Sequence, residues 1–123
     1  MPPTLALAIV SAAVGLAVGS FLAALAVRIP QRKPIVMDRS ACPHCGRRLP
    51  WFELIPVASW LIQKRRCRGC GAGISPLYPL MEIVSALIAT AAVLWVPWPL
   101  SIFACLAGWT CLTGAALLFE SRR

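Results

Sequence analysis

Residues 42–70 read CPHCGRRLPWFELIPVASWLIQKRRCRGC, a stretch with one Cys-x-x-Cys pair at each end. The two residues between the cysteines let both sulfurs of a pair face one ion, and a glycine follows each pair. Two such pairs, separated here by 21 residues, are typical of a tetrahedral zinc site with four thiolate ligands. Because a closed site of this kind leaves no position for water, we expect a structural zinc ion. The expected ligands are Cys42, Cys45, Cys67 and Cys70.

The same four cysteines can instead form two disulfide bonds, and the cellular compartment decides between the two states. Thiols stay reduced in the cytoplasm, whereas disulfides form and persist in oxidising compartments outside it. His44 lies inside the first pair, but four sulfurs already fill the coordination shell, so we expect this histidine to be an exposed spectator. The choice between zinc and disulfides therefore depends on the topology of the chain.

Apolar residues dominate the rest of the sequence. Of the 123 residues, 59% are hydrophobic and 13% are charged, whereas a soluble domain carries about 25% charged residues. Three runs with almost no charge, residues 4–27, 77–98 and 100–119, are each long enough to cross a bilayer core of ~30 Å. The sequence predicts an α-helical membrane protein, one domain overall, with three transmembrane helices. A small zinc-ribbon-like lobe, residues 28–76, is expected between the first two.

Positive charge is concentrated around the cysteines. The net charge is +8, and ten of the twelve lysines and arginines lie within residues 28–68, while the other two are Arg122 and Arg123. By the positive-inside rule, the lobe and the C-terminus are cytoplasmic and the N-terminus lies outside. A cleaved signal peptide does not fit, because no positive charge precedes the first apolar run. Nucleic-acid binding is disfavoured, because no aromatic residue interleaves with the basic run at 64–68.

The first apolar run carries small residues at four-residue spacing: Ser11, Gly15, Gly19 and Ala23. Small residues on one helix face let another helix approach closely. This stripe has two interpretations, packing against the chain's own helices or docking of a separate membrane protein. The sequence leaves both open.

The segment between the cysteine pairs, residues 49–62, is too apolar for a freely solvated loop. Pro56 is a suitable first residue for a short helix. Trp51 and Trp60 are then candidates to anchor the segment at the lipid headgroups, where basic residues attract anionic lipid. Alternatively, the segment forms the small core of the lobe itself, and both interpretations can hold together.

Several motifs together resemble the N-terminal region of bacterial type IV prepilin peptidases. The matching stretches are Gly19-Ser-Phe-Leu22, Arg28-Ile-Pro30, both cysteine pairs, residues 51–61, Ile74-Ser75 and Tyr78-Pro-Leu-Met-Glu82. The resemblance implies a multi-pass protein of the bacterial inner membrane. It also implies the family's activity, in which an aspartic endopeptidase cuts the leader from prepilins and from the pseudopilins of type II secretion. Many members also methylate the new N-terminus with S-adenosylmethionine, so this cofactor is implied by the resemblance only.

The sequence departs from this family at the catalytic residues. The family uses two aspartates, one of them in a Gly-x-Gly-Asp motif, whereas this sequence has a single aspartate, Asp38, and no such motif. We therefore expect no peptidase activity from these residues alone. Three roles stay open: half of an enzyme whose aspartates come from a membrane partner docked on the small-residue stripe, a remnant of a peptidase, or a non-enzymatic zinc-ribbon adaptor. A separate methyltransferase half is less favoured, because no glycine-rich loop follows a predicted strand.

Two glutamates, Glu82 and Glu120, are candidates for a substitute catalytic pair, because both lie near the cytoplasmic ends of adjacent predicted helices. A structural role explains them more simply. If Pro79 is the first helical residue, Glu82 lies in the first turn, where the helix dipole favours an acid. Glu120 can pair with Arg122 and Arg123. We therefore assign no catalytic residue with preference.

Overall fold

The fold consists of three long helices and one short helix in a computed structural model that describes residues 1–32, 42, 44–50, 52, 57–73 and 75–122. The long helices are α1 (Pro3–Arg28), α3 (Leu77–Trp95) and α4 (Leu100–Ser121), and the short one is α2 (Ala58–Ile62). No strand is present among these residues, where an isolated bridge joins Arg66 and Gly73. The predicted fold class, with three apolar helices and a four-cysteine segment between the first two, is confirmed.

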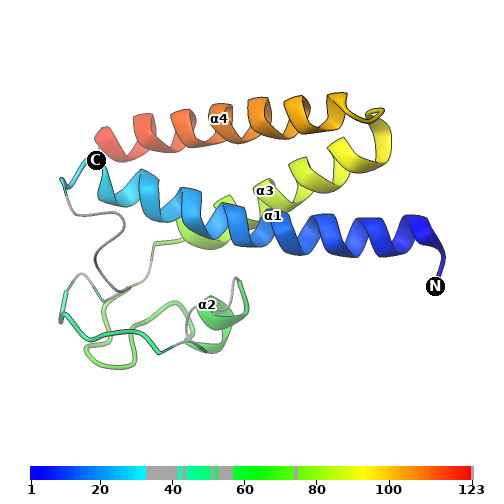
Figure 1. Ribbon diagram of the computed structural model, residues 1–123. Helices are drawn as coiled ribbons and strands as arrows, with labels where there is room; N and C mark the ends of the chain where they lie inside the picture. Colours follow the sequence, from blue (N-terminus) through cyan, green and yellow to red (C-terminus); the bar gives the residue numbers. More distant parts are fainter. Residues whose placement is uncertain (33–41, 43, 51, 53–56, 74, 123) are drawn as a thin grey trace.

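Prolines mark where the long helices begin and end, because a proline lacks the N–H that a helix interior requires. α1 begins at Pro3 and stops at Arg28, two residues before Pro30. α3 ends at Trp95, so that residues 96–99 form the turn into α4. All three helices are long and apolar enough to cross a membrane. They lie side by side, with the turn between α3 and α4 at the same end as the N-terminus (Figure 1).

α1 and α3 pack most closely, through the stripe of small residues. Ser11, Gly15, Gly19 and Ala23 are all buried. A Cβ atom added to Gly15 would lie 2.5 Å from the Cα of Ala86, and one added to Gly19 would lie 2.6 Å from the Cα of Glu82. The stripe is therefore occupied by the chain's own helix α3. The interpretation that it docks a separate membrane protein is wrong.

We expect Gly19→Val to loosen this helix pair. The new side chain would meet backbone atoms of α3, which cannot move aside as a flexible side chain can, and overpacking of this kind costs about 1–3 kcal/mol. Thermal unfolding in detergent should therefore shift to lower temperature. The matched control is Gly114→Val on α4, where no atom lies within 4 Å of an added Cβ. Equal shifts for the two variants would contradict the close approach.

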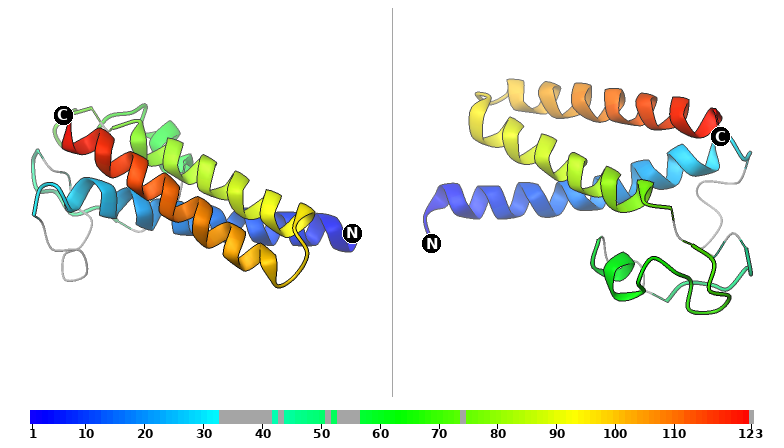
Figure 2. Two further views of the ribbon diagram at one scale, coloured as in Figure 1. Left: turned by 90° about the horizontal axis from the view of Figure 1, so that it is seen from above. Right: turned by 180° about the vertical axis from the view of Figure 1, so that it is seen from behind.

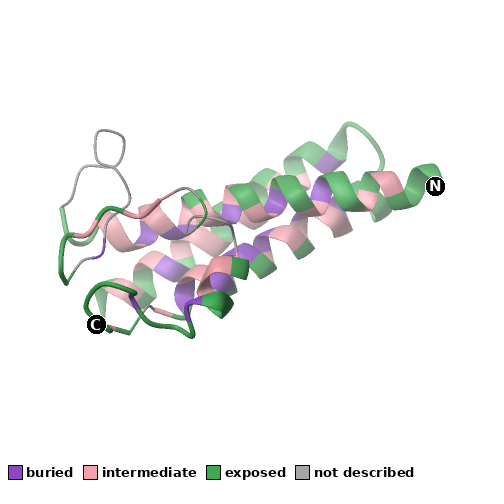
Figure 3. Ribbon diagram, turned by 90° about the horizontal axis from the view of Figure 1, so that it is seen from below, coloured by how far each residue is buried: buried purple, intermediate pink, exposed green. Residues whose placement is uncertain are grey.

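α4 packs against the other helices at several levels: near its middle, the Trp109 indole N–H donates a hydrogen bond to the Ser85 carbonyl oxygen of α3 at 3.4 Å. The core lies near the lobe and consists of Ala23, Ala26, Leu77, Met81 and Ala116. On α4, Ser101 and Ala116 are the buried residues, and many of its other side chains are exposed. Figure 3 shows the buried positions as separate bands along the helices, with exposed residues between them. Exposed apolar side chains of this kind are suited to contact with lipid or with further helices.

The lobe lies alongside the helices and not only beyond their ends. In Figure 1, α2 lies below α1, next to the beginning of α3, and Figure 2 shows the same placement from behind. The contact that holds it there joins the N-cap residue of α2, Val57, to α3: the backbone N–H of Val57 donates a hydrogen bond to the carboxyl group of Glu82. This contact positions the lobe against the bundle.

Candidate metal centre

The four predicted cysteine ligands converge. The Sγ atoms of Cys42 and Cys70 are 3.7 Å apart, those of Cys45 and Cys67 are 3.9 Å apart, and all four lie within 4.8 Å of one another. Four sulfurs bound to zinc at ~2.3 Å in a tetrahedron lie about 3.8 Å from each other. The sulfur separations are far longer than the ~2.05 Å of a disulfide bond, and all six cysteines are free. The arrangement therefore fits one metal ion.

The two cysteine pairs are built on the same hydrogen-bond pattern. In the first, the Gly46 N–H donates to the Cys42 carbonyl oxygen at 2.9 Å, and the Cys42 N–H donates to the Arg47 carbonyl oxygen at 2.9 Å. In the second, Gly71, Cys67 and Ala72 take the corresponding places, with both distances again 2.9 Å.

Each turn requires a glycine. Gly46 has a φ of 71° and Gly71 a φ of 73°, a left-handed conformation that other residues adopt with difficulty. No atom lies within 4 Å of a Cβ built on either glycine, so the requirement comes from the backbone conformation and not from crowding.

The turns also direct amide groups at the sulfurs, which changes the thiol pKa values. The N–H groups of Cys70 and Gly69 lower the pKa of Cys67 to about 6. The N–H groups of Cys45 and His44 lower the pKa of Cys42. The Ala72 N–H acts in the same direction on Cys70, but burial and the neighbouring sulfurs outweigh it and raise the pKa of Cys70 to about 11. Four thiolates at this distance repel one another, so some of the four thiols stay protonated until a cation is bound.

The cluster lies at the surface of the lobe. Cys42 and Cys67 are buried, whereas Cys45 and Cys70 are exposed. His44 is exposed and lies outside the group of converging ligands. The side chain of Arg47 crosses Gly69, where an added Cβ would lie 2.9 Å from the Arg47 Cδ. A basic side chain therefore lies directly beside the sulfurs, where it offsets negative charge on a thiolate centre.

Glu82 is placed differently from the sequence-based expectation. α3 begins at Leu77 and not at Pro79, so Glu82 lies in the second turn and no acid lies in the first. Its side chain is 5% exposed and accepts hydrogen bonds from the Val57 N–H and from the Ser20 hydroxyl on α1. No local sequence pattern predicts this contact. Glu82 therefore links α1, α3 and the lobe.

The remaining candidates are positioned as follows. Glu120 lies in the last turn of α4 and is half-buried, and its pairing with Glu82 or with Arg122 and Arg123 stays a prediction. Asp38, Trp51 and Pro56 lie outside the described residues.

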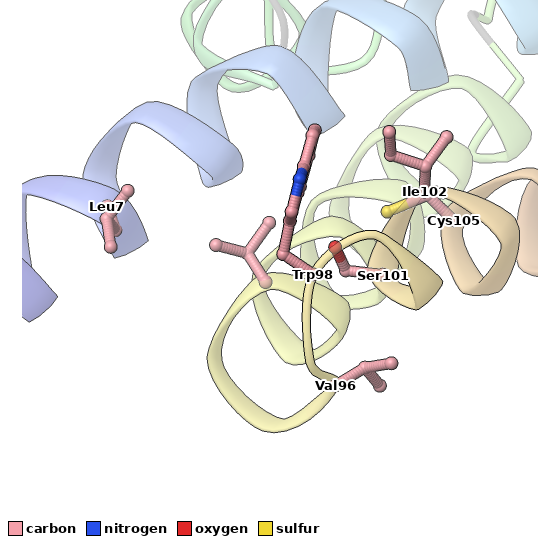
Figure 4. Close-up of a pocket in the computed structure, with 7 residues that line it drawn as sticks. Leu7, Val96, Trp98, Ser101, Ile102 and Cys105 are labelled. Carbon is pink, nitrogen blue, oxygen red and sulfur yellow. The ribbon is translucent and has the colours of Figure 1, made fainter.

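An apolar pocket lies at the end of the bundle that is remote from the cysteines. Its lining comes from α1, from α3 and the turn that follows it, and from α4: Leu7, Val93, Val96, Trp98, Ser101, Ile102 and Cys105 (Figure 4). Trp98, Ser101 and Cys105 carry the only polar side-chain groups among these residues, an indole N–H, a hydroxyl and a thiol, and no acid or base accompanies them. The pocket therefore offers no catalytic constellation.

Comparison with known proteins identifies the family. The family model of the bacterial peptidase A24 N-terminal domain matches residues 13–96, a stretch that contains α3, the lobe and most of α1. The chain belongs to this family. All four clustered cysteines and Glu82 lie inside the part that matches the A24 N-terminal domain.

Curated relatives of the A24 N-terminal domain carry the name prepilin leader peptidase/N-methyltransferase. The protein of Myxococcus xanthus (strain DK1622) is 44% identical over 109 residues, which are 87% of this chain and 29% of that protein. The protein of Bacillus subtilis (strain 168) is 46% identical over 63% of this chain and 32% of its own length, and that of Dichelobacter nodosus is 43% identical over 65% and 28%. The chain thus spans less than a third of the length of these relatives. No solved structure matches it.

Proposed function

We propose that this chain is the lobe-bearing part of a prepilin processing machinery in the bacterial inner membrane. The observation that supports the proposal most strongly is the four-sulfur cluster, which lies inside the family match and is built on two equivalent turns. Relatives are named for leader cleavage and N-methylation. Prepilins and pseudopilins are then the substrates.

In this proposal Cys42, Cys45, Cys67 and Cys70 bind a structural zinc ion. Four sulfurs at the observed spacing fill a tetrahedral shell, so the metal supplies folding free energy to the lobe and no activated water. The basic residues around the lobe support a cytoplasmic location for the lobe and for the C-terminus of α4, by the positive-inside rule. The hydrogen bond from Val57 to Glu82 then positions the lobe against α3 on that side.

The residues that hydrolyse the peptide bond are proposed to lie outside these 123 residues. Peptide hydrolysis by a carboxyl pair needs one ionised and one protonated partner, and here the only buried carboxyl among the described residues, that of Glu82, accepts a backbone N–H and links three segments. A polypeptide that carries two aspartates would have to contact a surface other than the buried stripe on α1. We propose S-adenosylmethionine-dependent methylation for the assembled enzyme only, and not for this chain by itself.

Purification of the tagged chain from its native membrane in mild detergent tests this proposal, followed by mass spectrometry and a cleavage assay with a prepilin. We expect a polypeptide with two cytoplasm-facing aspartates to be recovered, and the complex to cleave the prepilin when the chain alone does not. Gly19→Val, which loosens the bundle, should reduce recovery of that polypeptide, and Gly114→Val should not. Recovery of the zinc-bound chain alone would contradict the proposal and support a non-enzymatic adaptor or a remnant.

A further inference from the structure

We propose that α2 and the basic turn after it form a lipid-binding site, in which Leu61 and Ile62 insert among acyl chains and the neighbouring cations bind headgroup phosphates. The occupant is the bilayer surface next to the lobe. The inference rests on the level of α2 along the bundle, on the reversed polarity of its exposed face and on the charge beside it, and it does not depend on the proposed role in prepilin processing.

The level of α2 is set by its contact with α3. Glu82 lies five residues after the start of α3 at Leu77, which corresponds to about 7.5 Å along the helix axis. α3 has 19 residues, so its length is close to the ~30 Å of a bilayer core and little of it can extend beyond the lipid. The N-cap residue Val57 is therefore held at a depth typical of interfacial helices, whose apolar faces lie ~5–10 Å inside the headgroup boundary.

The exposure of side chains around α2 is the reverse of what water favours. Leu61 is 61% exposed and Ile62 is 66% exposed. Directly after them, the polar residue Gln63 is buried, and its side-chain oxygen has no hydrogen-bond partner. A helix that served only as the core of the lobe would bury the two apolar residues and expose the glutamine. Contact with an apolar medium on the outer side of α2 would stabilise the exposed Leu61 and Ile62 and so explains this pattern.

Of the two tryptophans expected to anchor this segment, Trp51 lies outside the described residues and Trp60 contacts a cation. Trp60 is half-buried, and the guanidinium group of Arg65 lies 5.0 Å from the centre of its ring. Its indole nitrogen is buried without a hydrogen-bond partner. The indole therefore supports the position of Arg65 by a cation–π contact, and Leu61 and Ile62 are the residues left to face lipid.

A tight turn places three cations beside the two apolar residues. Lys64 and Arg65 both have positive φ, 51° and 64°, which reverses the chain immediately after α2. Hydrogen bonds from Lys64 N–H to the Leu61 carbonyl oxygen and from Arg65 N–H to the Trp60 carbonyl oxygen, at 3.1 and 3.2 Å, fix this turn. Lys64, Arg65 and Arg66 are all exposed. An apolar pair next to such cations matches the acyl chains and phosphates of an anionic lipid surface.

Photo-crosslinking with benzoylphenylalanine tests the site in the full chain, both in native membranes and in nanodiscs of phosphatidylcholine and phosphatidylglycerol. The probe replaces Leu61 or Ile62. Leu87, exposed on α3, is the positive control, and Gly73, exposed on the lobe with no atom within 4 Å of an added Cβ, is the negative control. We expect lipid adducts at Leu61 and Ile62 at a level similar to that at Leu87 and several times that at Gly73. Adducts no more frequent than at Gly73, or crosslinks to protein in native membranes, would overturn the site.

The headgroup part of the proposal has its own test. At Leu61, phosphatidylglycerol adducts should exceed the share of that lipid in the nanodisc. The double substitution Lys64→Gln and Arg66→Gln should reduce this enrichment by up to about fivefold for each cation removed. Enrichment that does not change would overturn the assignment of these cations to phosphate, whatever the acyl-chain result.

Discussion

Replacing Cys67 with serine should unfold the lobe while the three long helices stay folded. A structural zinc site contributes about 10–16 kcal/mol of apparent binding free energy. Among the described residues of the lobe, only Cys42, Gln63 and Cys67 are buried, so we expect zinc binding to supply much of its folding free energy. Trypsin should then cleave at the basic residues around the cysteines under conditions in which the unchanged protein stays intact. Metal analysis should show the loss of one zinc ion per chain, and a strong chelator should reproduce both effects.

The matched control is Cys111→Ser, because Cys111 is an exposed cysteine on α4 that is not part of the cluster. It should change neither zinc content nor protease resistance. A reductant distinguishes the remaining alternative, since it would unfold a lobe held by disulfides and leave a zinc site intact. A Cys67→Ser protein that kept its resistance to trypsin would disprove the metal centre.

Replacing Glu82 with alanine should release the lobe from the bundle. The substitution removes the acceptor for the Val57 N–H, and the loss of this part-buried hydrogen bond costs about 1–3 kcal/mol. Val57 also has a φ of 58°, a conformation that is strained for a β-branched residue and that needs support from its surroundings. We expect amide exchange in residues 57–66 to accelerate roughly 10- to 100-fold.

Glu82→Gln keeps one acceptor oxygen and should accelerate exchange less than Glu82→Ala. Ile83→Ala tests the neighbouring position, because Ile83 is exposed on α3 and should leave exchange in the lobe unchanged. The zinc content of all three variants should stay the same, which separates loss of docking from loss of folding. Equal exchange rates in Glu82→Ala and in the unchanged protein would show that the carboxyl group does not hold the lobe.

The sequence was sufficient for those features that depend on local pattern. Apolar run length predicted the three long helices, and Cys-x-x-Cys spacing predicted the cluster. The contact between Val57 and Glu82 could not be predicted in this way, because it joins residues 25 positions apart and depends on how the lobe folds back on the bundle.

Two further features required the three-dimensional arrangement. The stripe from Ser11 to Ala23 predicts a close helix contact, but the sequence does not identify the helix that packs on it. In the structure, that helix is α3. Similarly, the apolar character of residues 49–62 left lipid contact and internal packing both open, singly or together. Only the exposure of Leu61 and Ile62 beside a buried Gln63 distinguishes the side of α2 that faces outward.

The order of residues along the chain has a consequence for biosynthesis. All four clustered cysteines precede Leu77, where α3 begins, so the complete ligand set leaves the ribosome before the helix that carries Glu82. Metal capture can therefore occur with α1 alone in the membrane. In the proposed zinc-bound form, insertion of α3 then supplies the carboxyl group for a lobe that is already folded around its ion. Defects in zinc supply and defects in helix insertion should therefore arrest the nascent protein at two different stages.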